Sequence, residues 1–121
     1  MKIKRMAIIP ARSGSIRIKN KNVKLFLKKP MISYPINALK KSKIFQKIHV
    51  STDSLKIKKI VEKLGLNIDF LRPKRLAKDS VIINDVLRFV IKNYKKKNII
   101  FDEVWLVYPC TPLITNSQLI T

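Results

Sequence analysis

The chain has 121 residues, of which 46% are hydrophobic, so it can build the core of one small domain and is not disordered by default. Lysine and arginine total 27 against 7 acidic residues, a formal net charge of +20, and 21 of the 27 are lysines. Dispersed lysines favour a solvated surface over a nucleic-acid-binding face, in which arginine and aromatic residues interleave. The single cysteine, Cys110, excludes an internal disulfide and a cysteine-based zinc site, and it fits a reduced, cytoplasmic protein.

No segment has the pattern of a membrane anchor or a secretion signal. The apolar run Met6–Ile9 is too short for a signal peptide. The uncharged stretch Val104–Thr121 contains two prolines and turns polar, whereas a membrane span needs about 20 mostly apolar residues. We therefore expect a soluble protein.

The first half of the chain alternates between apolar and polar segments. A buried strand is predicted over Ile3–Ala11, and the polar, basic residues Ala11–Asn22, which include one of only two glycines, are expected to form a loop. Pro30 is expected to open a short helix with Ile32, Ile36 and Leu39 on its apolar face. Lys47–Ser51 is predicted to be a second buried strand.

The second half continues the alternation. Asp53 or Ser54 can cap a helix that ends at Gly65, and a short third strand is predicted over Asn67–Leu71. Glu103–Tyr108 is predicted to be a fourth strand. Between the last two strands lies the clearest amphipathic helix, whose apolar positions are Ile83, Val86, Leu87, Val90, Ile91 and Tyr94.

This order of elements predicts an α/β fold with a mainly parallel sheet and right-handed crossovers, organised as a single domain. After the fourth strand, Thr115 and Gln118 form a capping box that announces a further helix, and only three residues follow it. We therefore expect residues 1–121 to be the N-terminal portion of a larger domain.

The loop after the first strand is the first candidate site, because ligands of parallel α/β sheets bind beyond the carboxyl ends of the strands. The glycine in this loop allows close approach of the backbone, and fixed cations with backbone N–H groups suit a phosphate chain. It matches neither a Walker A loop nor a dinucleotide fingerprint. On composition alone, a phosphate-binding loop and a merely solvated basic loop both stay open. The loop's cations are Arg12, Arg17, Lys19 and Lys21.

Four segments, taken together, resemble the signatures of the acylneuraminate cytidylyltransferases, the enzymes that make CMP-activated nonulosonic acids. The segments occur in the family's order and spacing and span essentially the whole chain. They are IIPARSGSIRIKNKN (Ile8–Asn22), VSTDS (Val50–Ser54), FLRPKRLAKD (Phe70–Asp79) and FDEVWLVYPCTPLIT (Phe101–Thr115). The resemblance implies a Rossmann-like nucleotidyltransferase domain with an inserted dimerisation element. Residues 1–121 would form its N-terminal, CTP-binding portion, and the full-length protein would be a homodimer.

The resemblance also implies a reaction for surface glycan synthesis. The anomeric hydroxyl of the sugar acid attacks the α-phosphate of CTP, pyrophosphate leaves, and Mg²⁺ assists. Arg12 and Lys21 would hold the triphosphate and stabilise its charge as catalytic residues. Arg72 would lie at the cytosine or ribose side. The nucleotide-binding residues implied are Gly14, Ser15, Arg17, Asn22 and Arg72.

The VYPCTP segment carries the sugar assignment. Its tyrosine resembles the branch that uses pseudaminic acid, whereas the branch that uses N-acetylneuraminic acid usually has glutamine there. Tyr108 and Thr111 are thus the candidate sugar-binding residues.

Two departures from the family pattern affect function. Ile16 stands where the family usually has lysine, although Arg17 beside it could compensate. The family's paired metal-binding aspartates lie beyond residue 121, and Asp102-Glu103 would sit at the wrong end of the sheet to replace them. We therefore expect residues 1–121 alone to be inactive. The alternatives are an inactive truncated relative and a small basic nucleic-acid-binding α/β protein.

Some single residues invite a functional interpretation that the pattern does not support. His49 lies in a strand without a partner histidine or cysteine, so we interpret it as structural. Cys110 is interpreted as a small filler near the strand end and Trp105 as a core residue. Asp53 fits a functional strand-end carboxylate and a helix cap equally well.

Overall fold

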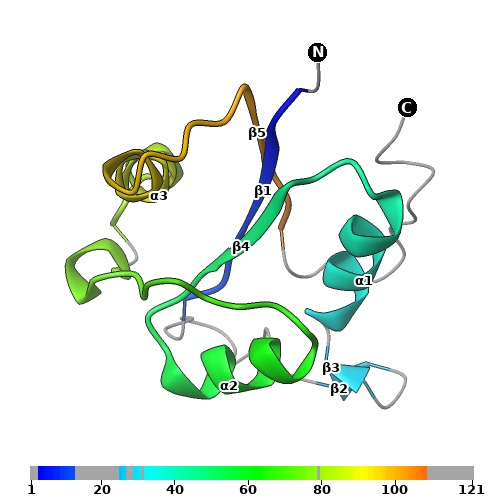
Figure 1. Cartoon of the computed structure of the whole chain (residues 1–121). Helices are drawn as coiled ribbons and strands as arrows, with labels where there is room; N and C mark the ends of the chain where they lie inside the picture. Colours follow the sequence, from blue (N-terminus) through cyan, green and yellow to red (C-terminus); the bar gives the residue numbers. More distant parts are fainter. Residues whose placement is uncertain (1–2, 13–24, 27–28, 31, 79, 109–121) are drawn as a thin grey trace.

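The protein is built around a parallel sheet flanked by helices on both faces (Figure 1). The computed structural model describes residues 3–12, 25–26, 29–30, 32–78 and 80–108. The sheet contains β1 (Arg5–Pro10), β4 (Lys47–Ser51) and β5 (Glu103–Leu106), in the order β4-β1-β5. The register places Met6 beside Lys47 on one side of β1 and beside Val104 on the other. The predicted α/β class with a parallel sheet is confirmed.

The central strand β1 is buried on both faces, which explains its continuous apolar sequence. Because side chains alternate along a strand, Ala7 and Ile9 point into one core cluster and Met6 and Ile8 into another. All four residues are 0% exposed. The sheet therefore separates two hydrophobic layers.

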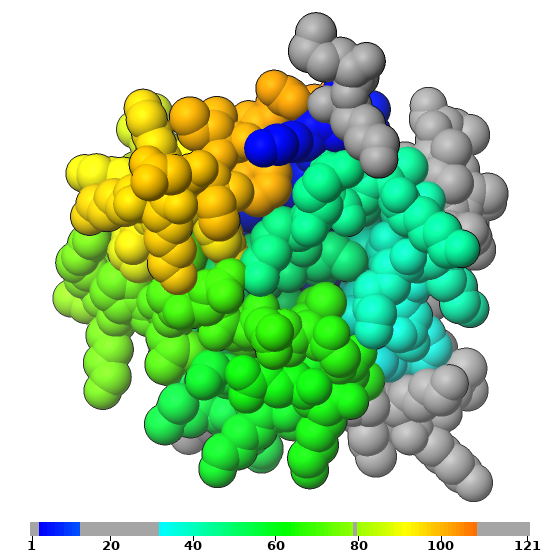
Figure 2. All heavy atoms as spheres, viewed as in Figure 1, coloured from blue at the N-terminus to red at the C-terminus, as the bar shows by residue number. Residues whose placement is uncertain are grey.

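The first layer lies under α1 (Ser33–Ser42) and α2 (Leu55–Lys63). Ile36 and Leu39 of α1 and Ile57 and Val61 of α2 are buried against the sheet. In the space-filling view, the green segment that contains α2 lies between the α1 and α3 regions (Figure 2).

The start of α1 corrects one prediction. Pro30 does not open this helix, because it pairs with Leu25 in a short antiparallel ribbon formed by β2 (Leu25–Phe26) and β3 (Lys29–Pro30). The helix begins at Ser33, and its first turn contains Pro35 instead. A proline fits there because the first-turn N–H groups have no partner within the helix.

The second layer lies under α3 (Ile83–Lys96), on the opposite face of the sheet (Figure 1). Val86, Val90 and Tyr94 are the buried residues of this helix, which confirms the predicted apolar face except at Ile91, which is 41% exposed. Phe70 packs in the same layer, with its ring centroid 5.1 Å from that of Tyr94. A 3₁₀ turn, η2 (Lys74–Leu76), precedes the helix.

The predicted third strand, Asn67–Leu71, is wrong: this segment forms no strand in the structure. Ile68 packs with the α1–α2 layer, whereas Phe70 packs with the α3 layer. Residues two apart in a strand point to the same face, so this segment must turn between the two side chains instead of extending. Directly after this segment, the Arg72 N–H donates to the carbonyl of Thr52, the residue that follows β4, at 2.7 Å.

The predicted ends of α2 are confirmed. Ser54 is the N-cap, and its hydroxyl accepts a hydrogen bond from the Ile57 N–H at 3.2 Å. Gly65 follows the helix with a φ of +95°, in the left-handed region that favours glycine.

The predicted fourth strand is shorter than expected, because β5 ends at Leu106, although the Val107 N–H still donates to the Ile8 carbonyl at 3.0 Å. Cys110 and the capping box at Thr115 and Gln118 lie outside the described residues. No helix in the described part of the chain combines the length and apolarity needed to cross a bilayer.

Candidate functional site

The connections of the sheet place a topological switch point beside β1. The chain passes from β1 through α1 on one face to β4, and later returns through α3 on the other face to β5, on the opposite side of β1 (Figure 1). In open α/β sheets, ligands bind beyond the carboxyl ends of strands at such a point. The carboxyl ends of β1, β4 and β5 therefore define the candidate site.

Three predicted site residues follow these strand ends within the described residues. Arg12 comes two residues after β1 and is half-buried, Arg72 is bonded to the end of β4, and Tyr108 comes two residues after β5 and is 56% exposed. The Ala11 N–H donates to the Ser51 carbonyl at 2.8 Å, so the chain leading to Arg12 stays attached to β4 beyond the end of β1.

The rest of the predicted site lies outside the described residues. The missing positions belong to the loop after β1 and to the segment after β5. They are Gly14, Ser15, Ile16, Arg17, Lys19, Lys21, Asn22 and Thr111.

Arg72 is the best-defined cation of the site, and it is only 5% exposed. Its Nε–H donates to the Ser51 hydroxyl at 3.1 Å, and its Nη2 group donates to the Ser51 carbonyl at 2.9 Å. Its Nη1 group donates to the Leu76 carbonyl at 3.4 Å. A guanidinium has five N–H donors. These three contacts hold Arg72 in place and use only three of the five donors.

The electrostatic surroundings of Arg72 link it to the other strand ends. Burial lowers the pKa of Arg72 from its ordinary value, the negative charge of Asp53 raises it, and the positive charge of Arg12 lowers it. The two guanidinium groups therefore repel each other at the ends of adjacent strands. An anion placed near both would relieve this repulsion.

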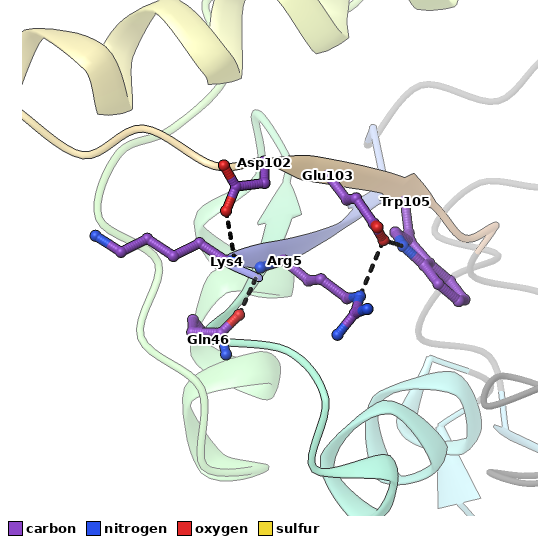
Figure 3. A network of polar contacts seen from close by, with 6 residues as sticks. All are labelled: Lys4, Arg5, Gln46, Asp102, Glu103 and Trp105. Carbon is purple, nitrogen blue, oxygen red and sulfur yellow. Dashed lines mark hydrogen bonds and ion pairs between the residues drawn. The ribbon is translucent and has the colours of Figure 1, made fainter. Parts of the chain in front are cut away.

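The acidic pair Asp102-Glu103 lies at the opposite, amino-terminal end of the sheet, as the sequence predicts (Figure 3). Asp102 accepts a hydrogen bond from the Lys4 N–H at 2.8 Å, and Glu103 forms an ion pair with Arg5 at 2.9 Å. Hydrogen bonds from Trp105 and Arg5 lower the pKa of Glu103. This pair fastens β5 to β1 and lies away from the candidate site.

The described residues offer no set of magnesium ligands at the strand ends. No group of three histidine, cysteine, aspartate or glutamate side chains comes together anywhere in residues 3–12, 32–78 or 80–108. Asp53 is the carboxylate that shares the site with Arg12 and Arg72.

His49 and Trp105 have structural positions. His49 is 1% exposed, and its Nδ1 atom lies 2.8 Å from the Tyr94 hydroxyl, which confirms the structural interpretation. Trp105 is half-buried and packs edge-on against Phe45, with ring centroids 5.1 Å apart. Sequence reasoning missed Ser51, which holds Arg72, although its place at a strand end was a usable signal.

A parallel sheet with helices on both faces, a switch point, and arginines at the strand ends define a Rossmann-like α/β domain of the nucleotide-binding type. The cytidylyltransferase family model matches residues 6–102. The chain belongs to the cytidylyltransferase family.

Individual relatives agree with this assignment. The chain is 37% identical over 117 residues to the pseudaminic acid cytidylyltransferase of Campylobacter jejuni serotype O:2, covering 97% of this chain and 50% of that protein. It is 37% identical over 108 residues to the CMP-N,N'-diacetyllegionaminic acid synthase of Legionella pneumophila, covering 88% of this chain and 46% of that protein. The chain thus spans about half the length of these curated relatives.

A solved structure shows the same fold. The structure of CMP:2-keto-3-deoxy-manno-octonic acid synthetase complexed with CTP matches with a TM-score of 0.79 and 22% sequence identity. The match covers 96% of this chain and 44% of that structure. The Rossmann-like nucleotidyltransferase fold predicted from the sequence is therefore confirmed.

Proposed function

We propose that this chain supplies the CTP-binding part of a cytidylyltransferase that converts a nonulosonic acid and CTP into the CMP-sugar and pyrophosphate. The observation that carries the proposal is the juxtaposition of Arg12 and the buried Arg72 at adjacent strand ends. Two repelling cations at the switch point of a family-matched domain suit the anionic nucleotide.

The proposed chemistry assigns charge stabilisation to the loop after β1. The anomeric oxygen of the sugar acid forms a bond to the α-phosphorus of CTP, and the bond from that phosphorus to the leaving pyrophosphate oxygen breaks. Arg12 and Lys21 would hold the phosphates and stabilise the charge that gathers on them. The binding residues proposed around them are Gly14, Ser15, Arg17 and Asn22, with Arg72 at the cytosine or ribose side.

The sugar acid is proposed at the end of β5. Tyr108 is exposed there, and Thr111 follows it in the sequence. The relatives support a nonulosonic acid as the class, because the C. jejuni and L. pneumophila proteins are named for two different members of it at the same 37% identity. Pseudaminic acid is the particular sugar that we propose, on the basis of Tyr108.

The remaining assignments concern the assembled enzyme. Mg²⁺ would offset charge on the α-phosphate and the leaving pyrophosphate, with ligands that we expect beyond residue 121. We further propose a cytoplasmic homodimer that takes part in surface glycan synthesis and has no specific nucleic-acid or membrane partner.

Nucleotide selectivity at two salt concentrations tests the proposal. Titration calorimetry of the protein with CTP, UTP and ATP should show tighter binding of CTP, and this preference should persist when the salt is raised. If all three nucleotides bind alike and binding weakens steeply with salt, the site recognises polyanions in general. That result would favour the nucleic-acid-binding alternative.

A further inference from the structure

Ser51, in the VSTDS segment, bonds to both segments that carry the cations of the candidate site. It is 1% exposed, at the end of β4. Its carbonyl oxygen accepts hydrogen bonds from the Ala11 N–H at 2.8 Å and from Nη2 of Arg72 at 2.9 Å. Its hydroxyl oxygen accepts a third hydrogen bond, from Nε of Arg72 at 3.1 Å. One residue thus bonds to the backbone before Arg12 and to the side chain of Arg72.

These contacts control how the two arginines lie relative to each other. Ala11 is 1% exposed and directly precedes Arg12, so its bond to Ser51 determines where the chain leaves the sheet. The two oxygens of Ser51 accept hydrogen bonds from adjacent N–H groups on one edge of the Arg72 guanidinium. This paired contact prevents rotation of the guanidinium plane.

We propose that Ser51 is a positioning residue of the nucleotide site, whose hydroxyl orients the Arg72 guanidinium toward CTP at a fixed place relative to Arg12. This inference rests on the proposed function. Ser51 itself does not contact the nucleotide in this arrangement, and it acts through Arg72. Asp53 attracts the Arg72 guanidinium and Arg12 repels it, and the Ser51 contacts fix the orientation of the guanidinium between these two charges.

Removing the hydroxyl should loosen Arg72 without removing it. In Ser51→Ala, the contacts of Arg72 with the carbonyls of Ser51 and Leu76 remain, and the Nε contact is lost. Loss of this hydrogen bond to a charged group should weaken CTP affinity by about tenfold.

The experiment compares two buried serines that each make one side-chain hydrogen bond. Ser42→Ala is the matched control, because the Ser42 hydroxyl donates to the Leu39 carbonyl at 2.7 Å within α1 and is not bonded to Arg72. CTP affinity is measured by titration calorimetry, and thermal unfolding is recorded for each variant. We expect about tenfold weaker CTP binding in Ser51→Ala and wild-type affinity in Ser42→Ala.

A double-mutant cycle separates positioning from general stability. In an Arg72→Ala background, Ser51→Ala should change CTP affinity less than about twofold, because the group that it orients is gone. An equal loss of affinity in both backgrounds would overturn the positioning role, and so would wild-type affinity in the single variant.

The wild-type protein supplies a second measurement that does not depend on the Ser51→Ala variant. In ¹⁵N NMR, the Arg72 Nε–H should give a signal whose hydrogen exchanges slowly with water. Loss of this signal in Arg72→Lys assigns it to Arg72. Addition of CTP should change its chemical shift. A fast-exchanging or unresponsive Arg72 signal would overturn the proposal. If the wild-type protein does not bind CTP, the proposed function and this inference both fail, whereas normal binding in Ser51→Ala contradicts the inference alone.

Discussion

The Nδ1 atom of His49 lies 2.8 Å from the hydroxyl oxygen of Tyr94, in the layer between β4 and α3. The Tyr94 hydroxyl donates its hydrogen to Oδ2 of Asp69 at 2.9 Å, because a carboxylate can only accept. His49 must therefore carry its proton on Nδ1 and donate to Tyr94. Asp69 also pairs with Lys47 at 2.7 Å, so a chain of contacts leads from the surface to the buried histidine.

The contacts in this series shift the pKa values of His49, Asp69 and Tyr94 from their ordinary values. Burial and, to a smaller extent, the positive charge of Lys47 lower the pKa of His49 from 6.5 to about 3. Burial acts to raise the pKa of Asp69, but hydrogen bonds from Lys47 and Tyr94 outweigh it and hold this pKa below its usual value of 3.8. Burial and the bond to Asp69 raise the pKa of Tyr94. At neutral pH, His49 is therefore neutral and Asp69 is ionised.

The pH dependence of the free energy of unfolding should reflect the protonation of His49 in the unfolded state. Its folded pKa of about 3 lies below the unfolded value of 6.5, so between these values the unfolded state binds one more proton than the folded state. The free energy of unfolding should therefore fall as the pH drops from 6.5 toward 3, by about 1.4 kcal/mol per pH unit. Asp69 adds its own loss only below its usual pKa of 3.8.

Urea unfolding at several pH values between 7 and 4 measures this slope. His49 is the only histidine of the chain, so His49→Gln should remove about one proton from the slope in this range. Glutamine keeps an N–H donor for Tyr94 and does not titrate. Identical slopes in the two proteins would show that His49 does not cause the acid sensitivity.

The end of α2 provides a backbone prediction. The Leu66 N–H donates to the Val61 carbonyl at 3.4 Å and the Gly65 N–H to the Glu62 carbonyl at 3.1 Å, which is the Schellman pattern around a left-handed residue. Gly65→Ala should lower the free energy of unfolding by about 1–2 kcal/mol. Its new Cβ atom would also lie 2.7 Å from Nζ of the flexible Lys40 side chain.

The matched control for this prediction is Asn98, which lies two residues after the end of α3 and has a φ of 63°. Asn98→Gly keeps the left-handed backbone and should change the free energy of unfolding by less than about 1 kcal/mol. Denaturant unfolding of both variants measures the difference. Equal, small effects at the two sites would mean that Gly65 is not required for its conformation.

The local sequence pattern is sufficient to predict α3, β1 and β4. The apolar spacing from Ile83 to Tyr94 repeats with the helix, β1 carries apolar side chains on both faces from Met6 to Ile9, and β4 is bounded by polar segments. The segment Asn67–Leu71 was mispredicted because Ile68 and Phe70 join different layers, which depends on tertiary packing. The β2–β3 ribbon was missed for the same reason, since pairing is not a local property.

The candidate site was predictable in location but not in its internal contacts. A loop after the first strand of a parallel sheet identifies the region of Arg12 from sequence alone. The contact of Arg72 with Ser51 joins residues 21 positions apart, and no spacing rule predicts it. The resemblance to the cytidylyltransferases identified Arg72, and the structure shows what holds it.

Arg12→Ala should weaken CTP binding by about tenfold to a hundredfold, because a charge-assisted contact to the triphosphate is lost. Arg5→Ala is the matched control, since Arg5 lies at the other end of β1 and pairs with Glu103 at 2.9 Å. Titration calorimetry with CTP compares the two variants. Equal affinities in Arg12→Ala and Arg5→Ala would rule out a triphosphate site at the end of β1.

Ile16→Lys should tighten CTP binding by several-fold, because it places a cation in the loop that we propose to hold the triphosphate. Ile3→Lys adds the same charge before β1, where Ile3 is 43% exposed, and should leave the affinity within about twofold at moderate salt. CTP titrations of both variants make the comparison. Unchanged or weaker binding in Ile16→Lys would indicate that Arg17 already supplies this charge.

Tyr108 should set the preference for the sugar acid. Because it follows β5 at the candidate site, Tyr108→Gln should shift the ratio of kcat/KM values from pseudaminic acid toward N-acetylneuraminic acid by about tenfold, equivalent to about 1.4 kcal/mol in the transition state. Parallel assays of pyrophosphate release with each sugar acid measure this ratio, in a protein that joins this chain to the C-terminal half of a related cytidylyltransferase. The KM for CTP serves as an internal control, because the nucleotide is proposed to bind at β1 and β4. Faster turnover of N-acetylneuraminic acid by the wild-type protein, or an unchanged ratio in Tyr108→Gln, would contradict the assignment of the sugar to this residue.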